Sequence, residues 1–223
     1  MAGYSGVLWP DGLLLAQQLL HLWVRGGWFV PEWKGRCLEL AAGIFALPSL
    51  VLAGSGRFSE VVATDLPGIV GANHSSINNN NHGFRADSLD LCRARDVEGM
   101  GKFDVIASSG VCQTNCGPAA LVGLSTVGTV VYMVVRSDAA DLHRVDFLLR
   151  GYFRELFRLD LGQAGRIHPG EQAYFLIWQR QFGPHSCWSE GYTFATCCLD
   201  RQDTHSCFDQ VFTREICCGS QSP

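Results

Sequence analysis

The sequence predicts a doubly wound α/β domain, with helices on both faces of a mostly parallel sheet, followed by a small cysteine-rich tail. Short β-branched runs alternate with helical segments through about residue 180, which is the pattern of parallel strands joined by helical crossovers. The last two runs are separated by too few residues for a parallel crossover, so they predict an antiparallel hairpin. Six of the ten cysteines lie in the last 37 residues, beyond that hairpin.

Composition narrows the class of protein. The 223 residues are 47% hydrophobic and carry a net charge of −4, with no run rich in Lys or Arg. A chain of this length can bury a core without cross-links, and its charge argues against nucleic acid as a partner. We therefore expect a protein or small-molecule partner. The sequence does not indicate an oligomeric state.

No membrane span or signal peptide is expected. The longest apolar segment, residues 13–24, is interrupted by Gln17, Gln18 and His21, and it lacks the length and flanks of either element. A cytoplasmic location is the default expectation. The cysteine-rich tail would also fit an oxidising compartment.

The predicted elements follow one another along the chain. A first helix opens at Pro10–Gly12, with Asp11 as its N-cap, and runs to about Val24. A second helix is expected to end at about Ala53, and further helices are expected over residues 69–77 and 141–156. A turn is expected after Ser108. Strands are expected at residues 36–40, 60–64, 84–89, 103–108, 127–136, 157–161 and 172–179. The outline is a Rossmann-like, seven-stranded sheet with a terminal antiparallel hairpin.

Two units are expected, residues 1–182 and 183–223. The second contains a motif, C-[WF]-x3-[YF]-T-x3-C-C, that begins at Cys187 and again at Cys207. Each copy is too small to bury a core, so it needs a cross-link or a partner. Disulfides are favoured over zinc because the paired C-x2-C spacing is absent. Upstream, Cys112 and Cys116 are expected to be small buried residues.

The candidate ligand site lies where the parallel strands end, because ligands of doubly wound sheets bind at the carboxyl ends of the strands. Glu39 lies at the end of the first strand and Asp65 at the end of the second. Two acids there suit a cationic ligand with an unphosphorylated ribose, such as S-adenosylmethionine. Glu39 could instead be a buried acid satisfied by backbone amides, and Asp65 could cap the next helix.

Four segments together carry a family resemblance. They are a W-x5-L-x3-L pattern starting at Trp9, CLELAAGIFALPSLVLA (37–53), VVATDLPGIVGAN (61–73) and KFDVIASSGV (102–111). The chain from about residue 6 to residue 180 resembles the family-16 methyltransferases, seven-strand enzymes that include many protein lysine methyltransferases and nicotinamide N-methyltransferase-like proteins.

The resemblance implies a strand order of 3-2-1-4-5-7-6 and S-adenosylmethionine as cofactor. The cofactor would lie over Ala41–Gly43 with Asp65 on its ribose, Trp9 nearby and the turn 87–91 beside the adenine. The implied methyl acceptor is a protein side chain or a small amine. The candidate cofactor-binding residues are Trp9, Glu39, Ala41, Gly43, Asp65, Leu66, Asp90 and Ser108.

The sequence also departs from the family. The turn after the first strand replaces ELGAGTG and is one residue longer, so Ala41 is expected to keep a negative φ, and Phe45 is expected to crowd the site. After the fourth strand, Gly110 and Gln113 replace the family's acid and aromatic residue, so no catalytic residue is assigned. The alternatives are a degenerate methyltransferase fold that acts as a binding scaffold, and a structural protein organised by the cysteine tail.

Overall fold

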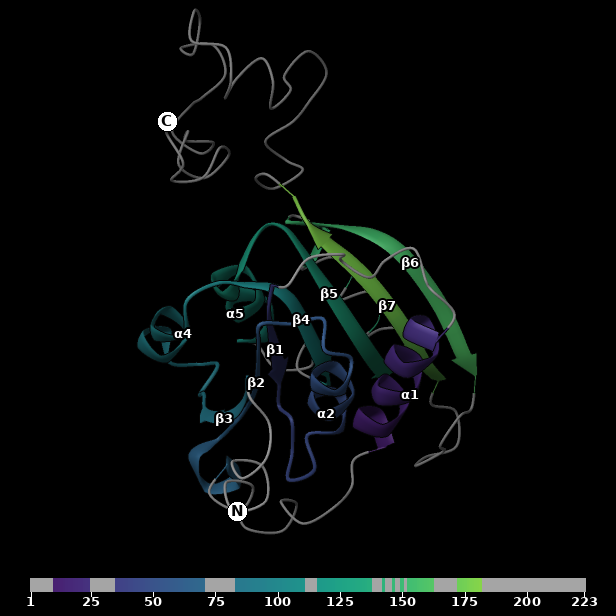
Figure 1. Cartoon of the computed structure of the whole chain (residues 1–223). Helices are drawn as coiled ribbons and strands as arrows, with labels where there is room; N and C mark the ends of the chain where they lie inside the picture. Colours follow the sequence, from purple (N-terminus) through teal and green to yellow (C-terminus); the bar gives the residue numbers. More distant parts are fainter. Residues whose placement is uncertain are drawn as a thin grey trace, which may run out of the picture.

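The structure, a computed structural model, describes residues 10–24, 35–70, 83–110, 116–137, 142, 146, 149–150, 152–162 and 172–181. Its centre is a seven-stranded sheet in the order β3-β2-β1-β4-β5-β7-β6 (Figure 1). This order confirms the one implied by the family resemblance. The helix expected over residues 69–77 lies outside the described residues after Val70, and the tail 183–223 lies outside them entirely.

The first five strands are parallel and the last two form the expected antiparallel pair. The strands are β1 (Arg36–Leu40), β2 (Glu60–Asp65), β3 (Phe84–Ser88), β4 (Phe103–Ser109), β5 (Ser125–Ser137), β6 (Phe153–Gly162) and β7 (Gln172–Arg180). In the register of the parallel strands, Glu39 lies between Ala63 of β2 and Ala107 of β4. β7 is antiparallel to both of its neighbours, β5 and β6.

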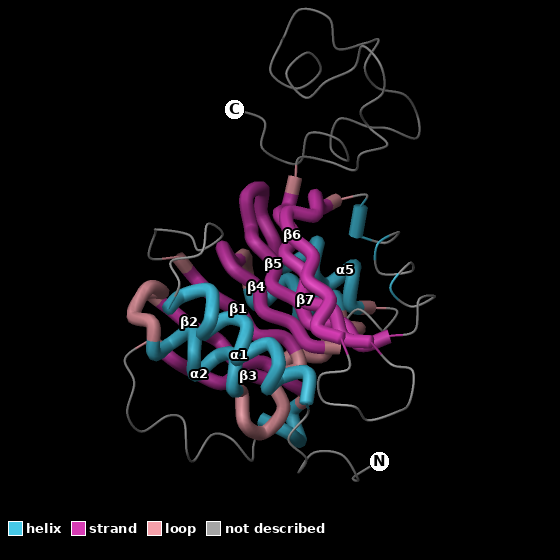
Figure 2. The backbone as a smooth tube through the Cα atoms, turned by 90° about the vertical axis from the view of Figure 1, so that its right-hand side faces the viewer, coloured by secondary structure: helices cyan, strands magenta, loops and turns pink. Residues whose placement is uncertain are grey.

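Helices cover both faces of the sheet. α1 (Pro10–Val24) and α2 (Leu47–Gly54) pack on one face through Leu15, Leu19 and Leu52. α4 (Ala94–Met100) and α5 (Gly117–Leu124) pack on the other. Figure 2 shows α1 and α2 on one side of the strands and α5 on the other.

The core is therefore double, one apolar layer on each side of the sheet. Val105 packs with the α1–α2 layer, whereas its neighbour Ile106 packs with the α4–α5 layer, and both are fully buried. Neighbouring residues of a strand point to opposite faces, so a strand covered on both sides is apolar throughout. This explains the continuous apolar runs in the sequence of the central strands.

Three expectations about elements were wrong. The helix predicted to continue to Leu156 ends earlier, because β6 begins at Phe153 and pairs with β7. The turn expected after Ser108 contains α5, and the helix α4 was not anticipated. Asp11 is not an N-cap, because the helix already includes Pro10; its carboxylate instead forms an ion pair with Arg136 of β5.

Candidate functional site

The carboxyl ends of the parallel strands meet at one edge of the sheet, at the bottom of Figure 1. In the sheet, β2 lies on one side of β1 and β4 lies on the other. The strand order therefore reverses between β1 and β4, which flank the topological switch point. In open α/β sheets a crevice forms at this point, and ligands bind there. The turns that follow β1 to β4 therefore form the candidate site.

The turn after β1 is unusually tight. Ala41 has φ of 54°, Gly43 of 61° and Ala46 of 42°, so the expectation of a negative φ at Ala41 was wrong. A left-handed conformation costs an alanine about 1 kcal/mol, and the surrounding structure must compensate. Part of that compensation is a hydrogen bond from Ala42 N to Thr64 O, 2.9 Å long, which ties the turn to β2.

Glu39 stabilises the start of α2, the helix that follows this turn. Its side chain is 1% exposed, and its Oε2 accepts a hydrogen bond of 2.8 Å from the backbone amide of Ser49, in the first turn of α2. The N-cap residue of α2, Ala46, makes no capping bond of its own, so Glu39 takes that role. Burial raises the pKa of Glu39 to about 8, although the hydrogen bonds from Ser49 act to lower it. The backbone N–H of Ser49 thus gives this acid a partner within the fold. Direct contact with a cofactor stays a prediction.

Asp65 joins three strand ends. Its Oδ2 accepts the amide of Gly43 at 2.8 Å and its Oδ1 accepts the amide of Leu66 at 2.7 Å. Its backbone carbonyl accepts the amide of Leu89, just beyond β3, at 2.8 Å. Asp65 is half-buried. The carboxylate therefore holds the β1 turn against the end of β2, in the position that the sequence assigned to it.

The turn after β3 is organised by Asp90. Its Oδ1 accepts the amide of Cys92 at 3.0 Å, and its Oδ2 lies 3.2 Å from Arg93 Nε. The backbone amide of Asp90 in turn donates to Asp96 Oδ2 of α4 at 3.3 Å. Asp90 thus stabilises its own turn, and the expected place of that turn beside an adenine stays a prediction.

Ser108 and the start of α1 lie at the same edge. Ser108 is fully buried at the end of β4, and within the described part of the chain its hydroxyl has no hydrogen-bond partner. A Cβ on Gly12 of α1 would lie 4.0 Å from the hydroxyl of Ser109, so α1 begins against the end of β4. Trp9, one residue before α1, lies outside the described residues.

The two departures from the family pattern now have a structural setting. Phe45 is 46% exposed, so it does not pack into the core beneath the turn, and crowding of the cofactor by Phe45 stays a prediction. Gly110 has φ of 74°, a conformation that few side chains adopt readily. Gln113 and Cys112 lie outside the described residues.

Sequence reasoning missed one covalent feature of this edge. Cys92, after β3, and Cys116, before α5, form a disulfide. The expectation that Cys116 is simply a small buried residue was wrong, because it is bonded and half-buried. Cys92 lies two residues before α4 and Cys116 immediately before α5, and both helices follow strands of one sheet. The missed helices α4 and α5 hid that relation.

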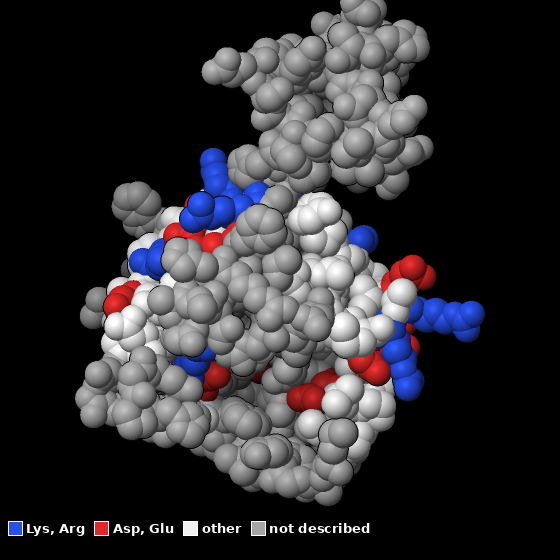
Figure 3. All heavy atoms as spheres, turned by 180° about the vertical axis from the view of Figure 1, so that it is seen from behind, with Lys and Arg blue, Asp and Glu red and all other residues white. Residues whose placement is uncertain are grey.

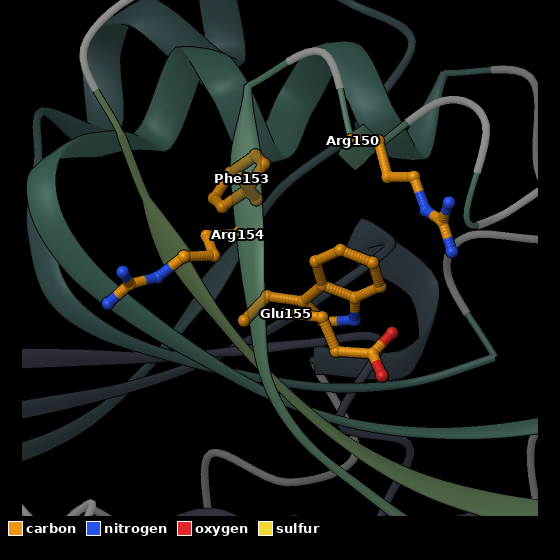
Figure 4. Close-up of a pocket in the computed structure, with 5 residues that line it drawn as sticks. Arg150, Phe153, Arg154 and Glu155 are labelled. Atoms are coloured by element: carbon orange, nitrogen blue, oxygen red, sulfur yellow. The ribbon is translucent and has the colours of Figure 1, made fainter. Parts of the chain in front are cut away.

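A hollow in the surface lies away from this edge. It has a volume of about 430 Å³ and is lined by Arg150, Phe153, Arg154, Glu155 and Trp178 (Figure 4). Trp178 pairs with Val131 of β5, well before the carboxyl end of that strand. The hollow is therefore separate from the switch point, and the indole nitrogen of Trp178 is itself covered.

One face of the molecule has described residues of mixed charge. On the face in Figure 3, Lys and Arg atoms are interleaved with Asp and Glu atoms and do not form one basic area.

Among the described residues, no group of His, Cys, Asp or Glu is arranged to hold a metal ion. None of the described helices is long and apolar enough to cross a membrane.

Among known proteins, solved structures share the fold of this chain. No family model matches the chain, and no curated protein matches it significantly. Among solved structures, TYW2 from Pyrococcus horikoshii in complex with MeSAdo superposes with a TM-score of 0.57 at 14% identity, over 80% of this chain and 65% of that one. Trm5b from Pyrococcus abyssi gives 0.55 at 15% identity, over 75% of this chain and 49% of that one.

A third structure is the fibrillarin pre-rRNA processing protein of Methanococcus jannaschii, with a TM-score of 0.52 at 14% identity, over 68% of this chain and 70% of that one. The chain has the Rossmann-like fold of methyltransferases. It spans about two thirds of TYW2 and about half of Trm5b.

Proposed function

We propose that the protein is an S-adenosylmethionine-dependent methyltransferase. The observation that carries the proposal is the linkage of Asp65 to the β1 turn, through the Gly43 amide at 2.8 Å, at the switch point of a sheet in this order. A carboxylate at the end of β2 is the group that commonly takes ribose hydroxyls in such sheets. The fold of the structural neighbours supports the same cofactor.

The residues at the edge fit such a ligand. A carboxylate has about four acceptor positions, and Asp65 uses two of them on the Gly43 and Leu66 amides, so two can accept hydroxyl groups. Glu39 places a second acid beneath the turn, and a nearby cation would favour its ionised form. The small residues Ala41 to Gly43 let backbone approach a ligand closely.

S-adenosylmethionine, when bound, supplies a methyl group already activated on a sulfonium. The chain then has to align an acceptor near that methyl group and exclude water. No residue is proposed as a catalytic base.

We further propose that the acceptor is a protein side chain or a small amine. The net charge of −4 supports this choice over a polyanionic acceptor, because neutralising phosphates requires clustered Lys and Arg. The interleaved charges on the face drawn in Figure 3 agree with it. Trm5b and the fibrillarin pre-rRNA processing protein extend beyond the part that this chain matches. RNA is the competing outcome, which an acceptor screen with labelled S-adenosylmethionine would reveal.

The cofactor site is tested by calorimetric titration with S-adenosylmethionine and S-adenosylhomocysteine. Asp65→Asn should weaken both by about tenfold or more, because one charged hydrogen-bonding group is worth roughly 1.5–3 kcal/mol. Asp160→Asn is the matched control, since Asp160 is an exposed acid on β6 whose side chain, among the described residues, accepts a bond from Gly162 N of its own strand. Folded wild-type protein that binds neither ligand at millimolar concentration would refute the proposal.

A binding scaffold with a degenerate site is the second candidate. Gly110 favours it, because the family's acid is absent from a position with φ of 74°. The two functions differ in one result. A scaffold binds S-adenosylmethionine, or nothing, and transfers no methyl group to any acceptor in the screen.

A further inference from the structure

The Cys92–Cys116 disulfide joins the entrances of two neighbouring helices. The cysteines are 24 residues apart in sequence, and their Cα atoms are 5.1 Å apart. Cys92 precedes α4, and Cys116 is the N-cap residue of α5. α4 and α5 themselves pack closely, since a Cβ on Gly123 would lie 2.7 Å from Val97 Cγ1.

The bridge links turns that belong to non-adjacent strands. β3 and β4 are separated in the sheet by β2 and β1, so no backbone ladder holds their carboxyl ends together. Asp90 bonds the Cys92 amide and so makes the post-β3 turn one unit with the bridge. On the other side, Gly110 N donates to Val134 O at 3.3 Å, and the chain leaves β4 there on its way to Cys116.

The ends of β2 and β1 lie between these two linked turns. In the sheet order, Asp65 and the β1 turn therefore follow the two strands that separate β3 from β4, the strands whose turns the bridge links. A cross-link that fixes the spacing of two turns lowers the number of arrangements that a ligand must order on binding.

We propose that Cys92–Cys116 is a reversible thiol–disulfide site that clamps the adenine side of the cofactor site, so that reduction weakens nucleoside binding. This inference rests on the proposed function. The oxidised form preorganises the two turns for the ligand. The reduced form lets the post-β3 turn and the entrance of α5 move independently.

The redox step is a two-electron exchange with a dithiol. One thiolate of the dithiol attacks a sulfur of the bridge, forms a mixed disulfide and releases one cysteine thiolate, which takes up a proton. The second thiol then attacks the mixed disulfide and releases the other cysteine. The protein gains two electrons and two protons, and the dithiol becomes a cyclic disulfide.

Cys37 is not an alternative partner for this exchange. It is the remaining described cysteine, and it is fully buried in β1. Burial raises the pKa of its thiol well above the ordinary value, and a protonated buried thiol is a poor nucleophile. Exchange at this edge therefore depends on Cys92 and Cys116 among the described cysteines.

The bridge itself can be mapped by peptides. Cleavage after Lys and Arg yields fragment 86–93 with Cys92 and fragment 103–136 with both Cys112 and Cys116. Without reductant, wild type and Cys112→Ser should both give these fragments linked. Cys116→Ser should give fragment 86–93 unlinked. A link that persists in Cys116→Ser and disappears in Cys112→Ser would overturn the assignment.

The clamp is tested by titrating S-adenosylhomocysteine into full-length protein with and without dithiothreitol. Reduction should weaken binding about threefold to tenfold in wild type and in Cys112→Ser. The double variant Cys92→Ser/Cys116→Ser should bind as reduced wild type does, with no response to dithiothreitol. This control separates the bridge from the cysteines of the tail.

Failure of the clamp and failure of the proposed function give different binding results. Equal affinity of oxidised and reduced wild type, or an unchanged response to dithiothreitol in the double variant, overturns the clamp and leaves the cofactor site standing. Absence of binding in every state of the folded protein overturns the proposed function and the clamp with it.

Discussion

Glu39 shows how one residue couples the site to stability. The sequence predicted an acid at the end of the first strand, and the structure gives it a partner that no sequence pattern specifies, the Ser49 amide 2.8 Å away. The partner depends on how α2 packs under the turn, which is a tertiary property. Burial then raises the pKa of Glu39 to about 8, and this has a measurable consequence.

Glu39→Gln should become more stable relative to wild type as pH rises. Below pH 4.5 the carboxyl is protonated in folded and unfolded chains; between pH 4.5 and about 8 only the folded chain keeps the proton. Each such pH unit costs wild type up to about 1.4 kcal/mol of unfolding free energy, and above pH 8 the loss is constant. Urea unfolding of both proteins at pH 5 and pH 8 should shift the difference toward the variant by on the order of 3 kcal/mol. A pH-independent difference would contradict the buried, protonated state.

Ala41 offers a test of backbone strain. Its φ of 54° was not predictable, because the sequence lacks the glycine that normally marks this conformation. Ala41→Gly should raise the unfolding free energy by about 1 kcal/mol, since glycine adopts positive φ without steric cost. Ala42→Gly is the control in the same turn; it should lower stability, because it only adds freedom to the unfolded chain. Thermal unfolding of both variants checks the pair, and equal effects would contradict the strain.

At the scale of elements, the errors came from competition between local and tertiary signals. Leu149, Phe153 and Leu156 have helical spacing, which favoured a helix through Leu156, but Phe153 pairs with Arg180 in the sheet. α5 reads GPAALVGL, and its glycines and proline indicate a turn in isolation. Strands with continuous apolar runs were predicted well, because burial on both faces leaves a strong local pattern.

The contact between α1 and β5 includes a largely buried ion pair beside its apolar packing. The side chains of Asp11 and Arg136 are 18% and 7% exposed. Removing one partner leaves a buried charge uncompensated, so Arg136→Met should cost about 3 kcal/mol of unfolding free energy. The double variant Asp11→Asn/Arg136→Met should cost less than the sum of the two single variants.

The control for this cycle is Arg93→Met, because Arg93 is 71% exposed in its ion pair with Asp90. An exposed pair contributes little, so this variant should change stability by less than about 1 kcal/mol. Urea unfolding of the wild type and of the four variants gives the free energies of unfolding. Additive losses at Asp11 and Arg136 would show that the two side chains act independently.

At the scale of the molecule, alternation of strands and helices predicted a doubly wound sheet but not its order. The order came from the resemblance in the segments around Glu39 and Asp65, and the structure confirms it. The acids were found because they end strands. The Cys92–Cys116 bridge and the Gly43–Asp65 bond were not predicted, because each joins residues that only the finished fold brings together.

The sheet supports the expectation that residues 1–182 fold as an independent unit. Every strand in the described part of the chain pairs with neighbours between residues 36 and 180, and Gln181 N bonds Tyr152 O at 3.0 Å, just after the last strand. Deleting residues 183–223 should therefore change the unfolding free energy by less than about 1 kcal/mol, which is about 2–4 °C in Tm for a domain of this size. Scanning calorimetry of the truncated and full-length proteins, both oxidised, measures this. A loss of about 10 °C or more would show that the tail stabilises the sheet domain, and would make the two units one cooperative structure.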